Sequence, residues 1–280
     1  MIGIFCSTTL FANLNSRNLL TLPTYLKIVS VAFVLGTILI CFVEEVDYRE
    51  LGKEEQTSNG LLNTLKKVFN LFSNSNFLTF ISILLISKIG NIFSNSIFDL
   101  VLIDYGVTQS FYANLTAFFI PVRMIISYYF SNIQGNYLKI FMSCHIKLTM
   151  VFILEYIYLI TYPIEYNTYV KVILLIIMET IKVYLYELSF SSMCGFFCKI
   201  VDINLGATYI TALHSVNNLS EGWPGIFVFH YVDVFGFKVI GIVSIIYCIV
   251  YYVCVRGIYY KIDDLPEQCW MVLYSKGKVD

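Results

Sequence analysis

The chain has 280 residues, of which 58% are hydrophobic and only 13% are charged, and its formal net charge is -1. Soluble domains carry about 25% charged residues, so this composition excludes an ordinary soluble domain and predicts an all-α polytopic membrane protein. A net charge so close to zero gives no support to a nucleic-acid partner. The partner that the composition does imply is a lipid bilayer.

Several apolar stretches are long enough to cross a membrane, which takes about 20 mostly apolar residues in a helix. The opening stretch MIGIFCSTTLFANL is apolar but shorter, and it has the character of the end of a span. Lysine and arginine are concentrated on the side of the spans that holds 44–75 and the C-terminus, so the positive-inside rule predicts that both are cytoplasmic. The predicted spans are about 23–43, 76–96, 110–131, 138–161, 169–197, 206–231 and 238–259.

The only long polar segment, 44–75, begins with the charged run EEVDYRELGKEEQTSNG. It continues into GLLNTLKKVFNLF, whose apolar residues share one helical face, as in a short helix lying at the membrane interface. A charged loop between two hydrophobic blocks also joins the halves of a two-bundle transporter. The sequence thus predicts spans within 1–43, a cytoplasmic loop at 44–75, a six-helix bundle at 76–259 and a cytoplasmic tail at 260–280.

Charged residues also occur inside the predicted spans, where insertion scales put their cost at about 2.5–3.5 kcal/mol each. Such residues usually face the interior of a bundle or a water-filled path. Lys88 and Arg123 have no opposite charge one turn away on their own helices. If both face one cavity, that cavity attracts an anion. Other charges can pair with each other, and the predicted intramembrane charge network consists of Glu155, Glu179, Lys182 and Glu187.

The stretch GATYITALHSVNNLSEGWPG, residues 206–225, carries a row of polar residues, which we call the polar stripe, inside an otherwise apolar segment. Its polar and small residues recur at steps of three and four, which places them on one face of a helix. Such a stripe lines a water-filled cavity or packs against another helix, and the sequence leaves both interpretations open. The stripe consists of Thr208, Thr211, Ser215, Asn218 and Gly222.

Patterns typical of catalysis or metal binding are absent from the sequence. The histidines at 145, 214 and 230 are scattered, and no HExxH, GxSxG or P-loop pattern occurs. Cys194 and Cys198 share a helix face, but no nearby histidine or carboxylate cluster would complete a zinc site. We therefore predict no catalytic residue, no metal and no cofactor, and we predict that the chain is not an enzyme.

The stretch 206–225 resembles the signature of the acetyl-coenzyme A transporter family (solute carrier family 33), a branch of the major facilitator superfamily. That signature runs close to GGTYMTLLNTxxNLGGxWP. The sequence departs from it at Ser220-Glu221, where the family has paired glycines, and Arg123 stands where the family tends to carry a neutral polar residue. LTFISILLISKIG, residues 78–90, resembles the family's seventh span. The matching signature residues are Gly206, Thr208, Tyr209, Thr211, Leu213, Asn218, Leu219, Trp223 and Pro224.

The resemblance implies a fold of two six-helix bundles, of which this chain supplies the end of the fifth span, the sixth span and the C-terminal bundle. The first bundle is then missing, and it comes either from a longer product of the same gene or from a second chain. The resemblance further implies a carrier in the endoplasmic reticulum membrane. Such a carrier moves acetyl-coenzyme A, a related acyl-coenzyme A or another anion by alternating access.

The resemblance and the polarity together name candidate substrate-binding residues. Lys88 and Arg123 would bind the phosphate groups of the ligand, and the polar stripe would make room for a bulky ligand. The rings of Tyr209 and Trp223 either stack on adenine or serve as packing anchors. Two other functions stay open, namely a seven-helix receptor and a membrane-embedded acyltransferase that uses acetyl-coenzyme A without moving it. The candidates are Lys88, Arg123, Thr208, Tyr209, Thr211, Ser215, Asn218 and Trp223.

Overall fold

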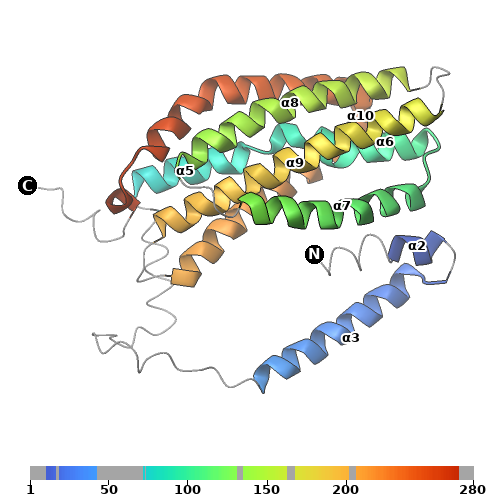
Figure 1. Ribbon diagram of the computed structural model, residues 1–280, viewed down its shortest axis with the longest axis horizontal. Helices are drawn as coiled ribbons and strands as arrows, with labels where there is room; N and C mark the ends of the chain where they lie inside the picture. The colour runs from blue at the N-terminus through green and yellow to red at the C-terminus, as the bar shows by residue number, and fades with distance from the viewer. Residues whose placement is uncertain are drawn as a thin grey trace, which may run out of the picture. The chain divides into compact units, whose positions relative to one another are not determined.

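The computed structural model describes residues 11–16, 19–42, 72, 74–130, 135–162, 168–201 and 206–270, and every regular element within these ranges is a helix (Figure 1). This is the all-α architecture that the composition predicts. The elements are α2 (Phe11–Ser16), α3 (Leu22–Cys41), α5 (Ser75–Ile86), η3 (Ile89–Asn91), η4 (Phe93–Ile97), α6 (Phe98–Asp104), α7 (Gln109–Phe130), α8 (Tyr137–Thr161), α9 (Thr168–Ile200), α10 (Gly206–Asp263) and η5 (Glu267–Trp270).

The chain divides into two compact units, residues 1–60 with 108–121 and residues 61–107 with 122–280. In the first unit, α3 is a 20-residue helix without a single charged residue after Lys27. Its described side chains are exposed apart from Tyr25 and Gly36, which are partly buried. The ring of Tyr25 stacks on Phe11 of α2 at a centroid distance of 4.4 Å. An apolar helix with exposed sides is what a lipid-facing span requires.

Within the described ranges, α3, α7, α8 and α10 are each long and apolar enough to cross a membrane. The pair formed by Ser75–Asn91 and Phe93–Asp104 adds a fifth candidate if it is counted as one bent span. The helix α9 has 33 residues, which is ample length, but it carries charges along its course. These helices are those of an integral membrane protein that crosses the bilayer several times.

Helices occupy the predicted spans, with two differences. The span predicted at 76–96 is not straight, because α5 ends at Ile86 and the chain passes through η3 and η4 into α6, with a bend of 45° between the two arms. The spans predicted at 206–231 and 238–259 both belong to α10, which is interrupted at Gly236 (φ 75°, ψ 157°). Glycine adopts this positive φ readily. The predicted loop 44–75 lies almost wholly outside the described residues.

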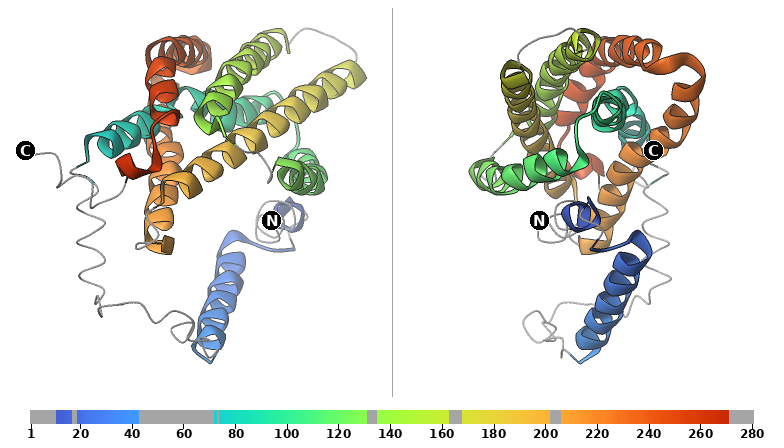
Figure 2. Two further views of the ribbon diagram at one scale, coloured as in Figure 1. Left: turned by 60° about the vertical axis from the view of Figure 1, so that its left-hand side comes forward. Right: turned by 90° about the vertical axis from the view of Figure 1, so that its right-hand side faces the viewer.

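The Gly236 interruption gives α10 a first arm (206–235) and a second arm (237–263). Figure 2 shows the two arms running in different directions. A continuous helix of 58 residues would greatly exceed the length of one span. The interruption therefore lets α10 supply two membrane-crossing segments.

The core of the second unit is built from aromatic side chains of α5, α9, the second arm of α10 and η5. The ring of Phe80 lies 5.0 Å from that of Phe196 and 6.0 Å from that of Trp270. All three side chains are fully buried. Trp270 belongs to the segment predicted as a cytoplasmic tail, 260–280. The helix α10 continues into this segment as far as Asp263, and the η5 tryptophan packs into the core.

Asp263, the last residue of α10, forms hydrogen bonds with the start of α8 and the end of α9. Its Oδ2 accepts hydrogen bonds from the backbone N–H groups of Leu138 (3.2 Å) and Lys139 (3.3 Å) at the start of α8. The first amides of a helix have no partner inside the helix, so this carboxylate caps α8 from a distant segment. Lys199, near the end of α9, donates to the backbone oxygen of Asp263 at 2.6 Å.

Candidate functional site

The end of α5 leaves four backbone carbonyl groups without helical partners, as every helix C-terminus does. Within a membrane such groups must find partners in the protein, and here side chains supply all four. Three of the four donors come from α10. The hydrogen bonds run from Tyr251 Oη to Ile83 O (2.9 Å), from Ser87 Oγ to Leu84 O (2.7 Å), from Trp223 Nε1 to Leu85 O (3.0 Å) and from Tyr247 Oη to Ile86 O (2.8 Å).

The segment 87–97, which we call the helix break, continues along the second arm of α10. A Cβ on Gly90 would lie 2.3 Å from Cys248 Sγ and 2.9 Å from the backbone oxygen of Ser244, so only glycine permits this approach. The following turn, Phe93–Ile97, is a π-helix, and π-helical turns are frequent at functional sites. Many transporters build their substrate sites from discontinuous helices. The helix break is therefore the candidate functional site.

Lys88 lies at the helix break, where it precedes η3. Its Nζ is 3.1 Å from Oε2 of Glu221 on the first arm of α10. The lysine side chain is 17% exposed and the glutamate side chain is 53% exposed, so the pair borders the open side of the break. The partner that Lys88 lacks on its own helix comes from α10. Glu221 is also one of the two positions where the sequence departs from the glycines of the family signature.

The polar stripe on the first arm of α10 is exposed. Thr208, Thr211, Ser215 and Asn218 all lie on the accessible side of the helix, and Gly222 continues the same face. The opposite face is packed into the core, where Tyr209 and Leu213 are fully buried. Of the two interpretations of the stripe, packing against a helix within the described residues does not fit this exposure.

The two aromatic candidates for stacking on a ligand are engaged in protein contacts. Tyr209 is fully buried, and its ring lies 5.7 Å from that of Phe77 on α5. Trp223 donates its indole N–H to Leu85, and its ring meets the edge of Phe227 at 6.0 Å. In this conformation both residues act as packing anchors.

Arg123 has a different carboxylate partner from Lys88. Its Nε lies 3.9 Å from Oε1 of Glu187 on α9, and Ser127 donates a hydrogen bond of 2.8 Å to Oε2 of the same glutamate. The predicted charge network included Glu187 beside Lys182. The structure instead pairs Glu187 with the second half of α7, and it gives Lys88 and Arg123 separate partners.

Glu155, Glu179 and Lys182 form an ion-paired group that we call the buried triad. Lys182 Nζ lies 2.8 Å from Glu155 Oε1 and 2.5 Å from Glu179 Oε1. The glutamate from α8 is fully buried, and the lysine is nearly so. The ammonium group also lies 5.4 Å from the ring centre of Phe98, and Asp99 of α6 interacts with it electrostatically.

The helix break and the buried triad are linked through Tyr186 on α9. The Tyr186 hydroxyl donates a hydrogen bond of 2.7 Å to Asn95 Oδ1 in η4. It lies within electrostatic reach of Lys182 and Glu155 on one side and of Glu221 on the other. Tyr186 thus interacts with both groups of charges and binds the π-helical turn.

Sequence reasoning missed several residues of this site. Tyr247 and Tyr251 were not considered, although two hydroxyl-bearing rings one turn apart in an apolar helix signal buried hydrogen-bond acceptors nearby. Glu221 was treated only as a departure from the signature, and Asn95 was not considered as a site residue. Their roles depend on contacts between helices far apart in the sequence, which a single-sequence pattern does not encode.

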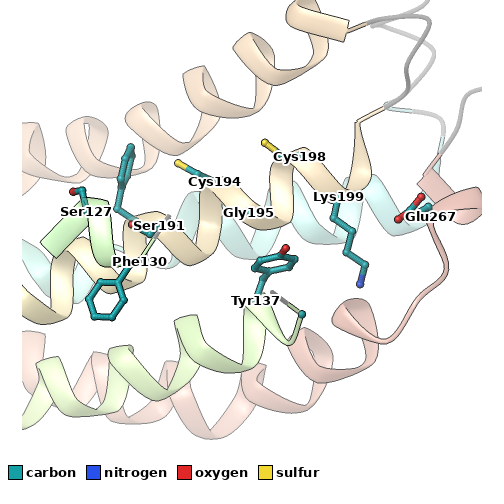
Figure 3. A pocket seen from close by; sticks show the side chains of 11 residues that line it. Ser127, Phe130, Tyr137, Ser191, Cys194, Gly195, Cys198, Lys199 and Glu267 are labelled. Carbon is teal, nitrogen blue, oxygen red and sulfur yellow. The ribbon is translucent and has the colours of Figure 1, made fainter. Parts of the chain in front are cut away.

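A second feature is an open cavity of about 720 Å³ at the end of the second unit where Asp263 lies. In Figure 3 the sulfur atoms of Cys194 and Cys198 point to one side of α9, and the Tyr137 ring and Lys199 ammonium point to the other. Lys199 already donates to Asp263, so its charge is engaged. The lining residues are Ser127, Phe130, Gly135, Tyr137, Phe190, Ser191, Cys194, Gly195, Cys198, Lys199 and Glu267.

None of the three histidines lines this cavity. His145 is buried, with Nε2 3.3 Å from the backbone oxygen of Cys248. The ring of His214 packs against Phe197 at 5.1 Å. An acyltransferase needs an accessible base beside its cavity, and the cavity offers no histidine for that role.

Comparison with known families gives one match. The family model described as acetyl-coenzyme A transporter 1 matches residues 133–250, which is less than half of the chain. The matched range contains the buried triad, the polar stripe and most of α10, whereas Lys88 and Arg123 lie outside it. No solved structure matches the chain. The match points to a transporter and not to an enzyme.

Proposed function

We propose that this integral membrane protein carries acetyl-coenzyme A, or a related anionic acyl-coenzyme A, across a membrane by alternating access, because residues 133–250 match the family model of acetyl-coenzyme A transporter 1. The observation that carries the proposal is the helix break, which holds Lys88 beside an exposed polar stripe. A discontinuous helix that presents a cation beside polar side chains is one wall of a site for a large anion.

The exposed stripe also supports the proposal that the substrate cavity lies between two helical bundles. A row of exposed hydroxyl and amide groups is more favourable against water or protein than against lipid tails, even though Ser215 Oγ already donates to the backbone oxygen of Thr211 at 2.9 Å. We therefore place a second bundle opposite the stripe, either from a longer product of the same gene or from a second chain. The arrangement is that of the major facilitator superfamily, with the cavity between two bundles, the C-terminus in the cytoplasm and the endoplasmic reticulum as the membrane.

Lys88 supplies the positive charge that an anionic substrate needs. The carboxylate of Glu221 competes with the substrate for this ammonium group. Without substrate, the carboxylate of Glu221 balances the ammonium group at 3.1 Å. A phosphate group that approaches from the open side takes the place of this exposed carboxylate. Arg123, held by Glu187 and Ser127, would contribute a second cation only after a rearrangement of that pair.

Uptake of labelled acetyl-coenzyme A into liposomes tests the proposal. The chain is reconstituted alone and, in parallel, as the product of the complete reading frame. Saturable uptake is expected, and uptake by the longer product alone would support a first bundle in cis. Uptake by the 280-residue chain reconstituted alone would support a second copy of this chain as the partner. If neither preparation takes up the substrate saturably, the proposed function is wrong.

A lysine variant pair tests the site itself. Lys88→Gln is expected to lower uptake at least about tenfold, since it removes the cation that meets the phosphates, a charge-assisted interaction worth about 1.5–3 kcal/mol. Lys147→Gln is the matched control, because it removes an exposed lysine of α8 far along the chain from the break. Equal uptake by both variants would exclude Lys88 from the substrate site.

A further inference from the structure

The buried triad contains more negative than positive charge. Among the residues that the structure describes, Lys182 is the only cation in direct contact with the carboxylates of Glu155 and Glu179. With both carboxylates ionised the triad therefore carries an excess negative charge. Asp99, which interacts with the same lysine from α6, adds to the excess. Uncompensated charge in a buried region is costly, because neither water nor a counter-ion stabilises it.

Two oxygen atoms beside the triad lack hydrogen bonds. Glu155 is fully buried and Ser94 of η4 is 1% exposed, yet Glu155 Oε2 and Ser94 Oγ make no hydrogen bond. The serine hydroxyl lies close enough to this carboxyl group for a weak side-chain hydrogen bond, but the contact falls outside ordinary hydrogen-bond geometry. An ionised carboxylate oxygen only accepts hydrogen bonds. A buried ionised oxygen without any donor is the least favourable arrangement for a glutamate.

A single proton lowers the excess negative charge and also supplies the missing hydrogen bond. Placed on Glu155 Oε2, it cancels one negative charge and changes an acceptor without a donor into a donor directed at Ser94 Oγ. A metal cation would fit this place less well than a proton, because it would lie beside the ammonium group of Lys182 and would need several further oxygen ligands. Within the triad the remaining charges then balance, because Lys182 is paired with the carboxylate of Glu179, and Asp99 is not counted in this balance.

We propose that Glu155 is a proton-binding site and that proton binding there is coupled to the transport cycle. The coupling part rests on the proposed transport function, whereas the proton site does not. Titratable groups face it from several elements: Asp99 from α6, Glu179, Lys182 and Tyr186 from α9, and Glu221 of α10, which acts through Tyr186. The proton moves between water and Oε2 with no other bond made or broken, and the charge of the triad changes by one.

The structure provides a route for the coupling. Ser94 and Asn95 are consecutive residues of the π-helical turn that follows Lys88. Asn95 accepts the hydrogen bond from Tyr186, and Ser94 is the neighbour of the orphaned Glu155 oxygen. Loss of the proton leaves Oε2 charged and in need of the serine hydroxyl as a donor. The protonation state thus acts on a turn that belongs to the same helix break as Lys88.

Infrared difference spectroscopy of the reconstituted chain, recorded as the pH is lowered, tests the proton site without any need for transport. The expected result is a carbonyl band of a protonated, buried carboxyl group that disappears in Glu155→Gln. Glu187→Gln is the matched control, because both oxygens of that glutamate have partners, and it is expected to keep the band. Absence of the band from the wild-type spectrum, or its persistence in Glu155→Gln, overturns the proposal.

Ser94→Ala covers the case in which Glu155→Gln does not fold. Removal of the hydroxyl that receives the proton's hydrogen bond is expected to shift the frequency of the carboxyl band while the band remains present. A band at an unchanged frequency would show that the proton is not on the oxygen that faces Ser94, and it would contradict the assignment.

Uptake driven by an inward proton gradient tests the coupling. The gradient is expected to change the initial rate by up to about tenfold per pH unit, the limit for a single titrating proton, and Glu155→Gln is expected to remove this dependence. A Glu155→Gln rate that still follows the gradient overturns the coupling but leaves the transport function intact. A positive infrared result in a protein that takes up no acetyl-coenzyme A leaves the proton site intact and rejects the transport function.

Discussion

Two lysines inside apolar helices, Lys88 and Lys182, are both paired with glutamates, but their surroundings are opposite. The Lys182 side chain is 10% exposed and the partner from α8 is fully buried, whereas Lys88 pairs with a glutamate that is 53% exposed. A buried charge depends on its partners for its stability, because nothing else compensates it. A charge at an open boundary can exchange its partner for a ligand. The comparison supports the proposals that the buried triad binds a proton and that the helix break binds the substrate.

The largest expected effect comes from Lys182→Met, which leaves two buried carboxylates without their cation. Loss of one partner from a buried ion pair costs about 3–5 kcal/mol of unfolding free energy, which is measurable as a shift in the denaturation midpoint of the detergent-solubilised protein. Lys147→Met, at an exposed position of α8, serves as the control and is expected to stay within about 0.5 kcal/mol of the wild type. A midpoint shift no larger than that of the control would show that the triad does not stabilise the fold.

An intermediate effect is expected from Trp223→Phe, which removes the indole donor from the carbonyl of Leu85 at the helix break. A buried acceptor left without its donor costs about 1–3 kcal/mol, again read from the denaturation midpoint. Tyr231→Phe removes a polar atom from an exposed ring on the same arm of α10, and we expect it to be near neutral. Wild-type stability of Trp223→Phe would mean that the break does not depend on its caps.

The smallest effect on stability is expected from Lys88→Gln, since pairs that are partly exposed contribute about 0–1 kcal/mol. The same variant should show the large loss of uptake described above, and this combination separates the two lysines most sharply. A loss of stability as large as that of Lys182→Met would show that Lys88 is structural, and it would remove the distinction between the two sites.

The sequence predicted the helical architecture well because hydrophobic length and composition are local properties. It also predicted that Glu179 and Lys182 can pair, since three residues separate them on one helix. It did not predict that the span at 76–96 breaks at Ser87. The free carbonyl groups at the break accept hydrogen bonds from Trp223, Tyr247 and Tyr251, which belong to a helix more than a hundred residues away in the sequence. Nothing near Ile86 other than Gly90 signals an interruption.

The candidate site was predicted in part. The polar stripe and Lys88 follow from polarity in an apolar context, and the structure leaves the stripe exposed and Lys88 at the break. The partner of each charge could not be predicted, because Glu187 lies on the same helix as Lys182 but contacts Arg123 and Ser127 of α7 instead. Which charges meet depends on how helices rotate about their axes when they pack, and short spacing rules apply only within one helix.

The capped end of α5 has a mechanical consequence. Trp223 belongs to the first arm of α10, and Tyr247 and Tyr251 belong to the second, so hydrogen bonds from both sides of Gly236 hold one short stretch of carbonyl groups. A change in the angle between the two arms would strain that stretch directly. Gly236 therefore lies at the point where the geometry of α10 and the end of α5 depend on each other, and Lys88 comes two residues after the last of these carbonyl groups.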